Sequence, residues 1–382
     1  MDSPHTTRRW RPALAVILAL SLAACGEPEQ APDAGAASPD GASAEPAPEE
    51  VTIPGAERSP LIAGMQGRRF TGDLPGMRER GVVRALVTYS RTDFFLDHGT
   101  IRGVQADFLR AYEAFLNRGV DRAEDKVRVR FIPVPFARLL PALEAGVGDV
   151  AAAFLTVTPE RRQRVAFSDD GNFRVSEVVV RHVDAAPVAA LADLSGQPVQ
   201  VLKGSSYAEH LAARNRELEA AGRAPIRVRE AASHLLSEDL LELVNAGVFP
   251  YTVVDDYKAR LWGRVLPDIR VHEDVVVAAD NPVGWAVRQG SPRLRASIDA
   301  FIEERAGLGS LLGNMLFKRY FENTRWVDDP TRGVARDRLE RYLPLFREYG
   351  ERYGFDPLLL AALAYQESGL DPSRESHRGA VG

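Results

Sequence analysis

Residues 150–168, VAAAFLTVTPERRQRVAFS, place a buried strand directly before the start of a helix. Positions 150–157 are apolar apart from Thr156, which is typical of a strand covered on both faces. Thr158 is a good N-cap residue, and Pro159 suits the first helical position. A further strand is expected at 177–181. A strand, a helix and a strand in this order predict an α/β layer with a largely parallel sheet.

The same alternation extends in both directions from this stretch. Strands are expected at 82–88, 127–134, 198–202, 226–230, 251–254, 271–278 and 283–288. Helices are expected at 105–116, at 136–145, from a capping box at 206–209 to about 221, from Ser237 to Gly247, and from Ser291 onward. The strand and helix rhythm therefore occurs twice, which predicts two α/β lobes.

Residues 80–305 resemble the periplasmic solute-binding proteins of the amino-acid-binding type. The resemblance rests on 103–109 (GVQADFL), 158–161 (TPER), 165–168 (VAFS), 204–207 (GSSY) and 284–288 (GWAVR). It implies an α/β two-lobed periplasmic-binding-protein-like domain, with the second lobe at about 185–275. Such proteins hold their ligand in the crevice between the lobes.

The resemblance also implies ligand-binding residues. Thr158 and Arg161 match the element that grips an α-carboxylate, Ser205 and Ser206 lie at a helix start with free N–H groups, and Asp255 follows a strand where the family often binds an α-amino group. Asp256 is adjacent, and the sequence does not choose between the two. Each has a structural interpretation as well: Thr158 and Asp255 as helix caps, and Arg161 as a solvated side chain. Three aromatic residues fit either the crevice or the core: Tyr89, Phe94 and Phe95.

The C-terminal residues 355–382, FDPLLLAALAYQESGLDPSRESHRGAVG, predict a helix that is buried on most of its surface. Asp356 caps it and Gly369 ends it. Glu367 then lies in the last turn, where partial burial and the helix dipole would both raise the pKa of its carboxyl group. That condition suits a general acid that works near neutral pH. The alternative is a solvated glutamate at a helix end.

Residues 361–368, Ser376 and 379–382 resemble the opening of the lysozyme-like domain of lytic transglycosylases. The resemblance implies that Glu367 is catalytic and that Ser368 orients it. One carboxylate suffices there, because the sugar's own 6-hydroxyl is the nucleophile and closes a 1,6-anhydro ring. In that family roughly a hundred further residues complete the cleft. We therefore expect 336–382 to be the N-terminal part of an incomplete all-α lysozyme-like domain, joined to the lobes by a connector at 306–335.

The N-terminus has the pattern of a lipoprotein signal peptide at 1–24. Three arginines precede the apolar run 13–24, which ends in LAAC at 22–25 and resembles the lipobox of bacterial lipoproteins. Cys25 would become the lipidated first residue; a plain secretory signal is the alternative. Gly26 in place of Asp implies the periplasmic face of the outer membrane. Residues 25–55 are rich in Ala, Pro and Glu, which predicts a disordered tether.

Composition excludes several function classes. A net charge of −5 and the absence of a basic run argue against nucleic-acid binding. The histidines have no metal-ligand spacing, and the sequence has no phosphate loop or dinucleotide fingerprint, so no metal or cofactor is expected.

The expected function is a lytic transglycosylase, a carbon-oxygen lyase that cleaves the MurNAc-GlcNAc β-1,4 bond of peptidoglycan glycan strands. Its lobes would bind a small amino-acid-bearing ligand or muropeptide. The alternative is a lipid-anchored solute-binding protein with a non-functional catalytic remnant.

Overall fold

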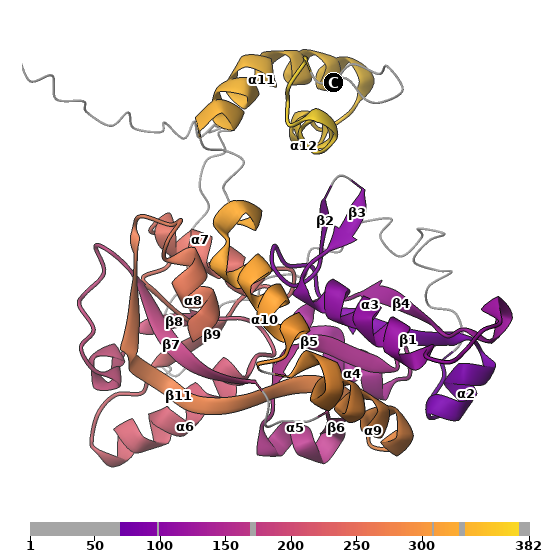
Figure 1. Ribbon diagram of the computed structural model, residues 1–382. Helices are drawn as coiled ribbons and strands as arrows, with labels where there is room; N and C mark the ends of the chain where they lie inside the picture. Colours follow the sequence, from indigo (N-terminus) through magenta and orange to yellow (C-terminus); the bar gives the residue numbers. More distant parts are fainter. Residues whose placement is uncertain (1–68, 98, 169–172, 308, 328–332, 374–382) are drawn as a thin grey trace, which may run out of the picture. The chain divides into compact units, whose positions relative to one another are not determined.

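The computed structural model describes residues 69–373 apart from 98, 169–172, 308 and 328–332 (Figure 1). The expected signal peptide, Cys25, the tether at 25–55, Ser376 and 379–382 lie outside the described residues. Within the described residues, no helix is both long enough and apolar enough to cross a bilayer.

The first lobe is built on strands β4 (Arg128–Pro133), β1 (Val82–Val87) and β5 (Val150–Thr156), which pair in parallel in that order. The short strand β6 (Val165–Phe167) pairs with β11, which also pairs with β5. The helices of this lobe are α2 (Leu74–Glu79), α3 (Val104–Leu116), α4 (Leu139–Glu144), α5 (Pro159–Arg164) and α9 (Pro292–Phe301). A separate hairpin consists of β2 (Phe95–Asp97) and β3 (Thr100–Arg102).

The second lobe contains β7 (Arg174–His182), β10 (Tyr251–Asp255), β8 (Pro198–Val201) and β9 (Arg227–Glu230), in that spatial order. The last three are parallel, whereas β7 runs antiparallel to β10. The helices of this lobe are α6 (Ser206–Ala220), α7 (Ser237–Asn245) and α8 (Asp256–Trp262). The predicted capping box at 206–209 is wrong: Ser205 is the N-cap residue, and its side chain does not cap the helix.

One long strand, β11 (Ile269–Arg288), passes from the second set of strands to the first (Figure 1). It pairs antiparallel with β7 and then with β5 and β6. The prediction of two strands, 271–278 and 283–288, is therefore wrong. The intervening Asp280 and Pro282 are typical of a turn, but register shifts absorb them and Asp280 takes a left-handed φ of 54°. The sheet is thus parallel among β4, β1 and β5 and among β10, β8 and β9, and antiparallel where β7 and β11 join these two sets.

The module's apolar core extends into the predicted connector at 306–335. Helix α10 (Leu311–Phe317) continues as a π-helix (Lys318–Glu322) and buries Leu316, Tyr320 and Phe321 against the second lobe. Met315 on the same helix is 45% exposed. The segment up to about Val327 is consequently part of the folded module.

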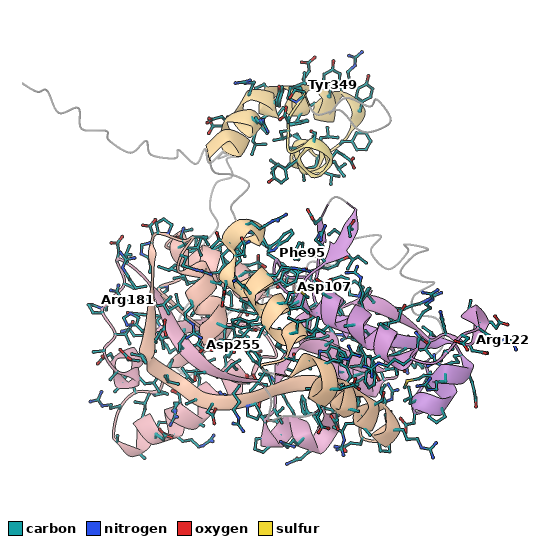
Figure 2. All side chains as sticks on the ribbon, in the orientation of Figure 1. Phe95, Asp107, Arg122, Arg181, Asp255 and Tyr349 are labelled. Atoms are coloured by element: carbon teal, nitrogen blue, oxygen red, sulfur yellow. The ribbon has the colours of Figure 1, made fainter. Side chains whose placement is uncertain are left out.

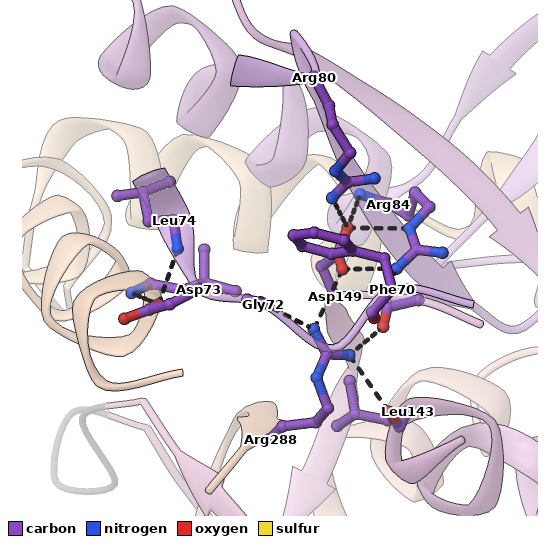
Figure 3. Close-up of polar contacts among 11 residues, drawn as sticks. Phe70, Gly72, Asp73, Leu74, Arg80, Arg84, Leu143, Asp149 and Arg288 are labelled. Atoms are coloured by element: carbon purple, nitrogen blue, oxygen red, sulfur yellow. Dashed lines mark hydrogen bonds and ion pairs between the residues drawn. The ribbon is translucent and has the colours of Figure 1, made fainter. Parts of the chain in front are cut away.

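A buried ion cluster anchors the first lobe and was not foreseen from the sequence (Figure 3). Asp149 is fully buried, and its Oδ1 lies 2.7 Å from Arg84 Nη2 and 3.1 Å from Arg288 Nη2. Burial by itself raises the pKa of Asp149, but the hydrogen bonds from Arg84 outweigh it and hold the pKa below its ordinary value. The cluster therefore ties β1, β5 and β11 together through one carboxylate.

Helices α11 (Gly333–Tyr353) and α12 (Pro357–Ser368) pack against each other. The predicted ends of α12 are confirmed: Asp356 Oδ1 accepts the Leu358 and Leu359 N–H groups, and Gly369 adopts a left-handed φ of 68°. The predicted burial is wrong, because the described residues cover only one side of α12. Its exposed apolar side chains, at 40–66%, are Leu358, Leu359, Leu363 and Tyr365.

Candidate functional site

A crevice between the two lobes brings together most of the predicted ligand-binding residues. Its free volume is about 30 Å³. The first lobe contributes the segment after β1 and the end of β5, and the second lobe contributes the starts of α6, α7 and α8. The polar lining residues are Thr88, Ser90, Asp93, Thr156, Arg161, Ser205, Ser206, Ser237, Glu238, Asp255 and Lys258.

Thr158 does not line the crevice, although it is next to residues that do. Its Oγ1 accepts the Arg161 N–H at 3.2 Å, so it caps α5 as the sequence allowed. Its side chain is buried. Thr158 therefore acts here by fixing the start of the short helix that carries Arg161.

Arg161 is only 3% exposed, so its interpretation as a solvated side chain is wrong. Its Nε lies 3.1 Å from Glu209 Oε1, and its Nη1 and Nη2 donate to the carbonyls of Thr156 and Gly204 at 3.0 Å each. Three of its five N–H donors are thus used within the protein, and one on each terminal nitrogen has no partner among the described residues. Because Glu209 and Gly204 belong to the second lobe, Arg161 bridges the crevice.

The two serines at the start of α6 have different partners. Ser205 Oγ donates to the Leu202 carbonyl at 2.7 Å, and Ser206 Oγ donates to Glu177 Oε1 at 2.6 Å. His210 Nδ1 lies 2.9 Å from the other oxygen of Glu177, which is fully buried. Both serine hydroxyls therefore hold the helix start in place, and what they present to the crevice is this fixed backbone.

Asp255, at the end of β10, lies inside the module between the lobes (Figure 2). It is 5% exposed, and its Oδ1 is buried with no hydrogen-bond partner among the described residues. Burial raises the pKa of Asp255 to about 7, although nearby Lys258 offsets part of the effect. The geometry also separates Asp255 from Asp256, which binds Arg260 at 2.6 Å outside the crevice.

Three charged crevice residues were missed from the sequence: Asp93, Glu238 and Lys258. Lys258 Nζ lies 3.2 Å from Asp93 Oδ2, and Glu238 Oε1 accepts the Arg91 N–H at 3.0 Å. Burial raises the pKa of Asp93. Burial by itself lowers the pKa of the Lys258 ammonium group, but the nearby carboxylates, of which Asp93 has the largest effect, outweigh it and raise that pKa. Lys258 could have been found, since lysine is rare in this chain and Lys258 lies three positions after Asp255, the N-cap residue of α8.

The aromatic trio does not form one wall. Tyr89 is 50% exposed and lines the crevice, whereas Phe94 belongs to the core of the first lobe. Phe95 packs against Trp326 with ring centroids 5.3 Å apart. Only Tyr89 thus belongs to the crevice.

The second candidate site, on α12, has a different character. Glu367 is exposed, so the predicted partial burial of its carboxylate is wrong. Ser368 is buried, and its Oγ donates to the Ala364 carbonyl at 3.1 Å. The described residues therefore place Glu367 at the end of a well-capped helix with its carboxylate open to solvent.

Residues 83–322 match the bacterial extracellular solute-binding proteins, family 3. The chain belongs to this family. The matched span ends at the residue where the π-helix of the module ends.

Curated relatives match a longer part of the chain than residues 83–322. The chain is 29% identical over 320 residues to membrane-bound lytic murein transglycosylase F of Desulfosudis oleivorans. This alignment covers 82% of this chain and 66% of that protein. It is 30% identical over 318 residues to the protein of the same name from Aeromonas hydrophila, over 82% of this chain and 60% of that protein. The chain thus spans about three fifths to two thirds of the length of these relatives.

Solved structures of other proteins resemble the two-lobed module. An ancestral arginine-binding protein bound to arginine has a TM-score of 0.52 and 26% identity, and covers 63% of this chain and 99% of that one. The same kind of protein bound to glutamine has a TM-score of 0.52 and 25% identity, over 64% and 99%. These similarities agree with the predicted two-lobed α/β fold.

Proposed function

We propose that this chain is a peptidoglycan lytic transglycosylase whose solute-binding module regulates or positions the catalytic helices. The similarity to relatives named lytic murein transglycosylase F, over about four fifths of the chain, carries the proposal. The bond cleaved is the MurNAc-GlcNAc β-1,4 linkage of glycan strands, and the products end in 1,6-anhydro-MurNAc.

Glu367 would protonate the glycosidic oxygen and then, as a carboxylate, accept the proton of the 6-hydroxyl. The internal hydroxyl attacks the anomeric carbon, so no second carboxylate is needed to activate water. Ser368 lies next to Glu367 and is fixed on the Ala364 carbonyl, so it would hold the helix end rigid beneath the acid. Binding of a glycan strand would supply the desolvation that the exposed Glu367 lacks in the described residues.

The activity is tested by incubating the purified chain with insoluble peptidoglycan and analysing the soluble products by mass spectrometry. We expect 1,6-anhydro-muropeptides from the native chain and at least a hundred-fold less from Glu367→Gln, because general acid–base catalysis contributes about 10²–10⁴-fold. Glu348→Gln on α11 is the matched control, since Glu348 is exposed. Products that survive Glu367→Gln would refute the assignment of the acid.

The module's ligand is proposed to be a small amino-acid-bearing molecule, such as a free amino acid or a wall peptide. Asp255 supports this, because a buried carboxylate oxygen without a partner suits a ligand ammonium group. The two remaining N–H donors of Arg161 suit one carboxylate. Calorimetric titration with amino acids and muropeptides tests the assignment, and Asp255→Ala should abolish any binding that is found.

The alternative function is an amino-acid-type solute-binding protein that passes its ligand to another protein. Its specific support is the crevice itself, which has the polar lining of such a site, whereas Glu367 lies exposed. Tight binding of a free amino acid without any 1,6-anhydro product would favour this alternative.

We also propose that the chain is anchored by lipid on Cys25 to the periplasmic face of the outer membrane. The support is the lipobox at 22–25. Incorporation of labelled palmitate into the native chain but not into Cys25→Ala, together with membrane fractionation, tests both the anchor and its membrane.

A further inference from the structure

A second cavity, of about 470 Å³, lies next to the place where β11 passes from one lobe to the other. Its volume falls within the roughly 300–1,000 Å³ that is usual for small-molecule sites. Val283, Gly284 and Trp285 of β11 form one wall, and Phe317 and Phe321 of the segment after the module's last strand form another. None of its lining residues except Phe154 also lines the crevice.

The walls of this cavity are mainly aromatic, and they are braced from behind. Phe154 and Phe173 pack with ring centroids 5.3 Å apart, and Phe317 and Phe321 pack at 5.2 Å. Tyr257 supports Phe321 at 4.8 Å. Rings that hold one another in edge-on and tilted contacts resist collapse into the space between them, so the cavity is preformed for an apolar molecule.

Three of the polar lining residues lie on one side of the cavity. Asn314, Lys318 and Glu322 recur every four residues along α10 and the π-helix, which places them along one face. Lys318 is exposed and has no ion-pair partner among the described residues. The Lys318 ammonium group would attract one anionic group of a ligand. The Glu322 carboxylate, one turn further on, would repel a second anionic group.

Phe154 connects this cavity to the crevice. It lines both, and its φ of 47° is a left-handed value that a phenylalanine rarely adopts. The β5–β11 pairing is irregular at the same place, since Leu155 pairs with Gly284 but Ala151 pairs with Ala286. Backbone strain of this kind persists where the surroundings impose it, and it is often found at ligand sites.

We propose that this cavity is a second ligand site, for an amphiphile with a compact apolar body and one anionic group, such as a medium-chain fatty acid. The apolar body fills the space between the rings, and the anion lies at Lys318. Phe154 lines both this site and the crevice. The assignment does not depend on what the crevice binds or on any transglycosylase activity.

The test uses the whole chain with dodecanoate, followed by calorimetry, and with a diazirine-bearing analogue of dodecanoate, followed by irradiation and peptide mass spectrometry. We expect saturable binding of one dodecanoate per chain. Label should fall on peptides that contain Phe173 or residues 311–322, and excess dodecanoate should suppress it. No saturable binding, or label confined to the exposed apolar residues of α11 and α12, would overturn the proposal.

Two variants and a control sharpen the result. Ala306→Phe fills the cavity and should weaken dodecanoate binding at least ten-fold. Met315→Phe places the same ring nearby in the chain but outside the lining, so binding should not change. Lys318→Gln, at an exposed position that tolerates change, should weaken dodecanoate several-fold and leave dodecanol unaffected. Native affinity in Ala306→Phe, or equal effects of Lys318→Gln on both molecules, would contradict the site or its polarity.

Discussion

At the scale of single residues, Asp255 has the least ordinary environment in the crevice. It is buried, one of its oxygens has no partner, and its pKa rises from 3.8 to about 7. If the pKa of a carboxyl group is higher in the folded than in the unfolded chain, ionisation of that group lowers the free energy of unfolding. This loss of stability grows as the pH rises from about 4 and is complete above about 7.

Asp255→Asn should therefore stabilise the free module, and the gain should depend on pH. The expected rise in melting temperature over the native chain is small at pH 4, grows through pH 7 and is constant above it, because only the native chain carries the buried charge. Circular dichroism melts at several pH values measure this difference. Asp256→Asn is the control, since Asp256 is paired with Arg260. A gain that is equal at pH 4 and pH 8 would contradict the ionised state assigned to Asp255.

The sequence predicted which residues meet in the crevice better than it predicted their partners. Arg161, Ser205, Ser206 and Asp255 follow strand ends and helix starts, whose position in an α/β fold is regular. The partner of Arg161 is Glu209, which the local pattern assigned to a capping box. A side-chain pair that joins two lobes depends on their orientation, and no local pattern encodes that orientation.

At the scale of elements, the start of α3 shows how a helix positions a crevice residue. Gly103, with φ of 120°, precedes α3, and the Thr92 and Asp93 carbonyls accept the N–H groups of Val104 and Gln105 at 2.9 and 3.0 Å. A Cβ atom on Gly103 would lie 2.3 Å from the Asp93 carbonyl oxygen. The helix start therefore requires glycine, and it fixes the segment that carries Asp93.

Gly103→Ala should destabilise the chain by more than the roughly 1–3 kcal/mol expected from backbone strain alone, because the segment at Asp93 must also move. Urea unfolding measures the loss. Gly119→Ala is a matched control, since Gly119 also has a positive φ, of 69°, but has no atom within 4 Å of the added Cβ. Equal losses in the two variants would show that the contact with Asp93 is unimportant.

Elements with strong local signals were predicted well, and those that depend on distant contacts were not. The ends of α12 follow from Asp356 and Gly369, which act on their own helix. The continuity of β11 does not follow from residues 279–282, because pairing with β7 overrides their turn preference. Burial of α12 was overestimated for the same reason: an apolar run indicates that a helix can be covered, whereas only tertiary packing decides whether it is.

At the scale of the whole module, ion pairs among the described residues join the two lobes, and they include Arg161 with Glu209 and then Lys258 with Asp93. In the second pair, the side chains are 12% and 8% exposed, so solvent and salt screen it weakly. Removing one partner of a buried pair leaves an uncompensated charge, whereas replacing both by apolar residues removes the cost of burial as well. The two kinds of change therefore have different expected results.

Lys258→Met should destabilise the chain by about 3–5 kcal/mol, because Asp93 then keeps a buried charge beside Glu238. The double variant Lys258→Met, Asp93→Leu should recover much of that loss, and urea unfolding of both variants measures the difference.

Arg122→Met is the surface control. Its pair with Glu124 is 73% and 62% exposed and lies at the edge of the module (Figure 2), so solvent screens it and the loss of stability should be far smaller than for Lys258→Met. If the double variant is as unstable as Lys258→Met, the loss comes from packing of the lysine stem rather than from the charge left on Asp93. The lobes would then be held together at this point by apolar contact.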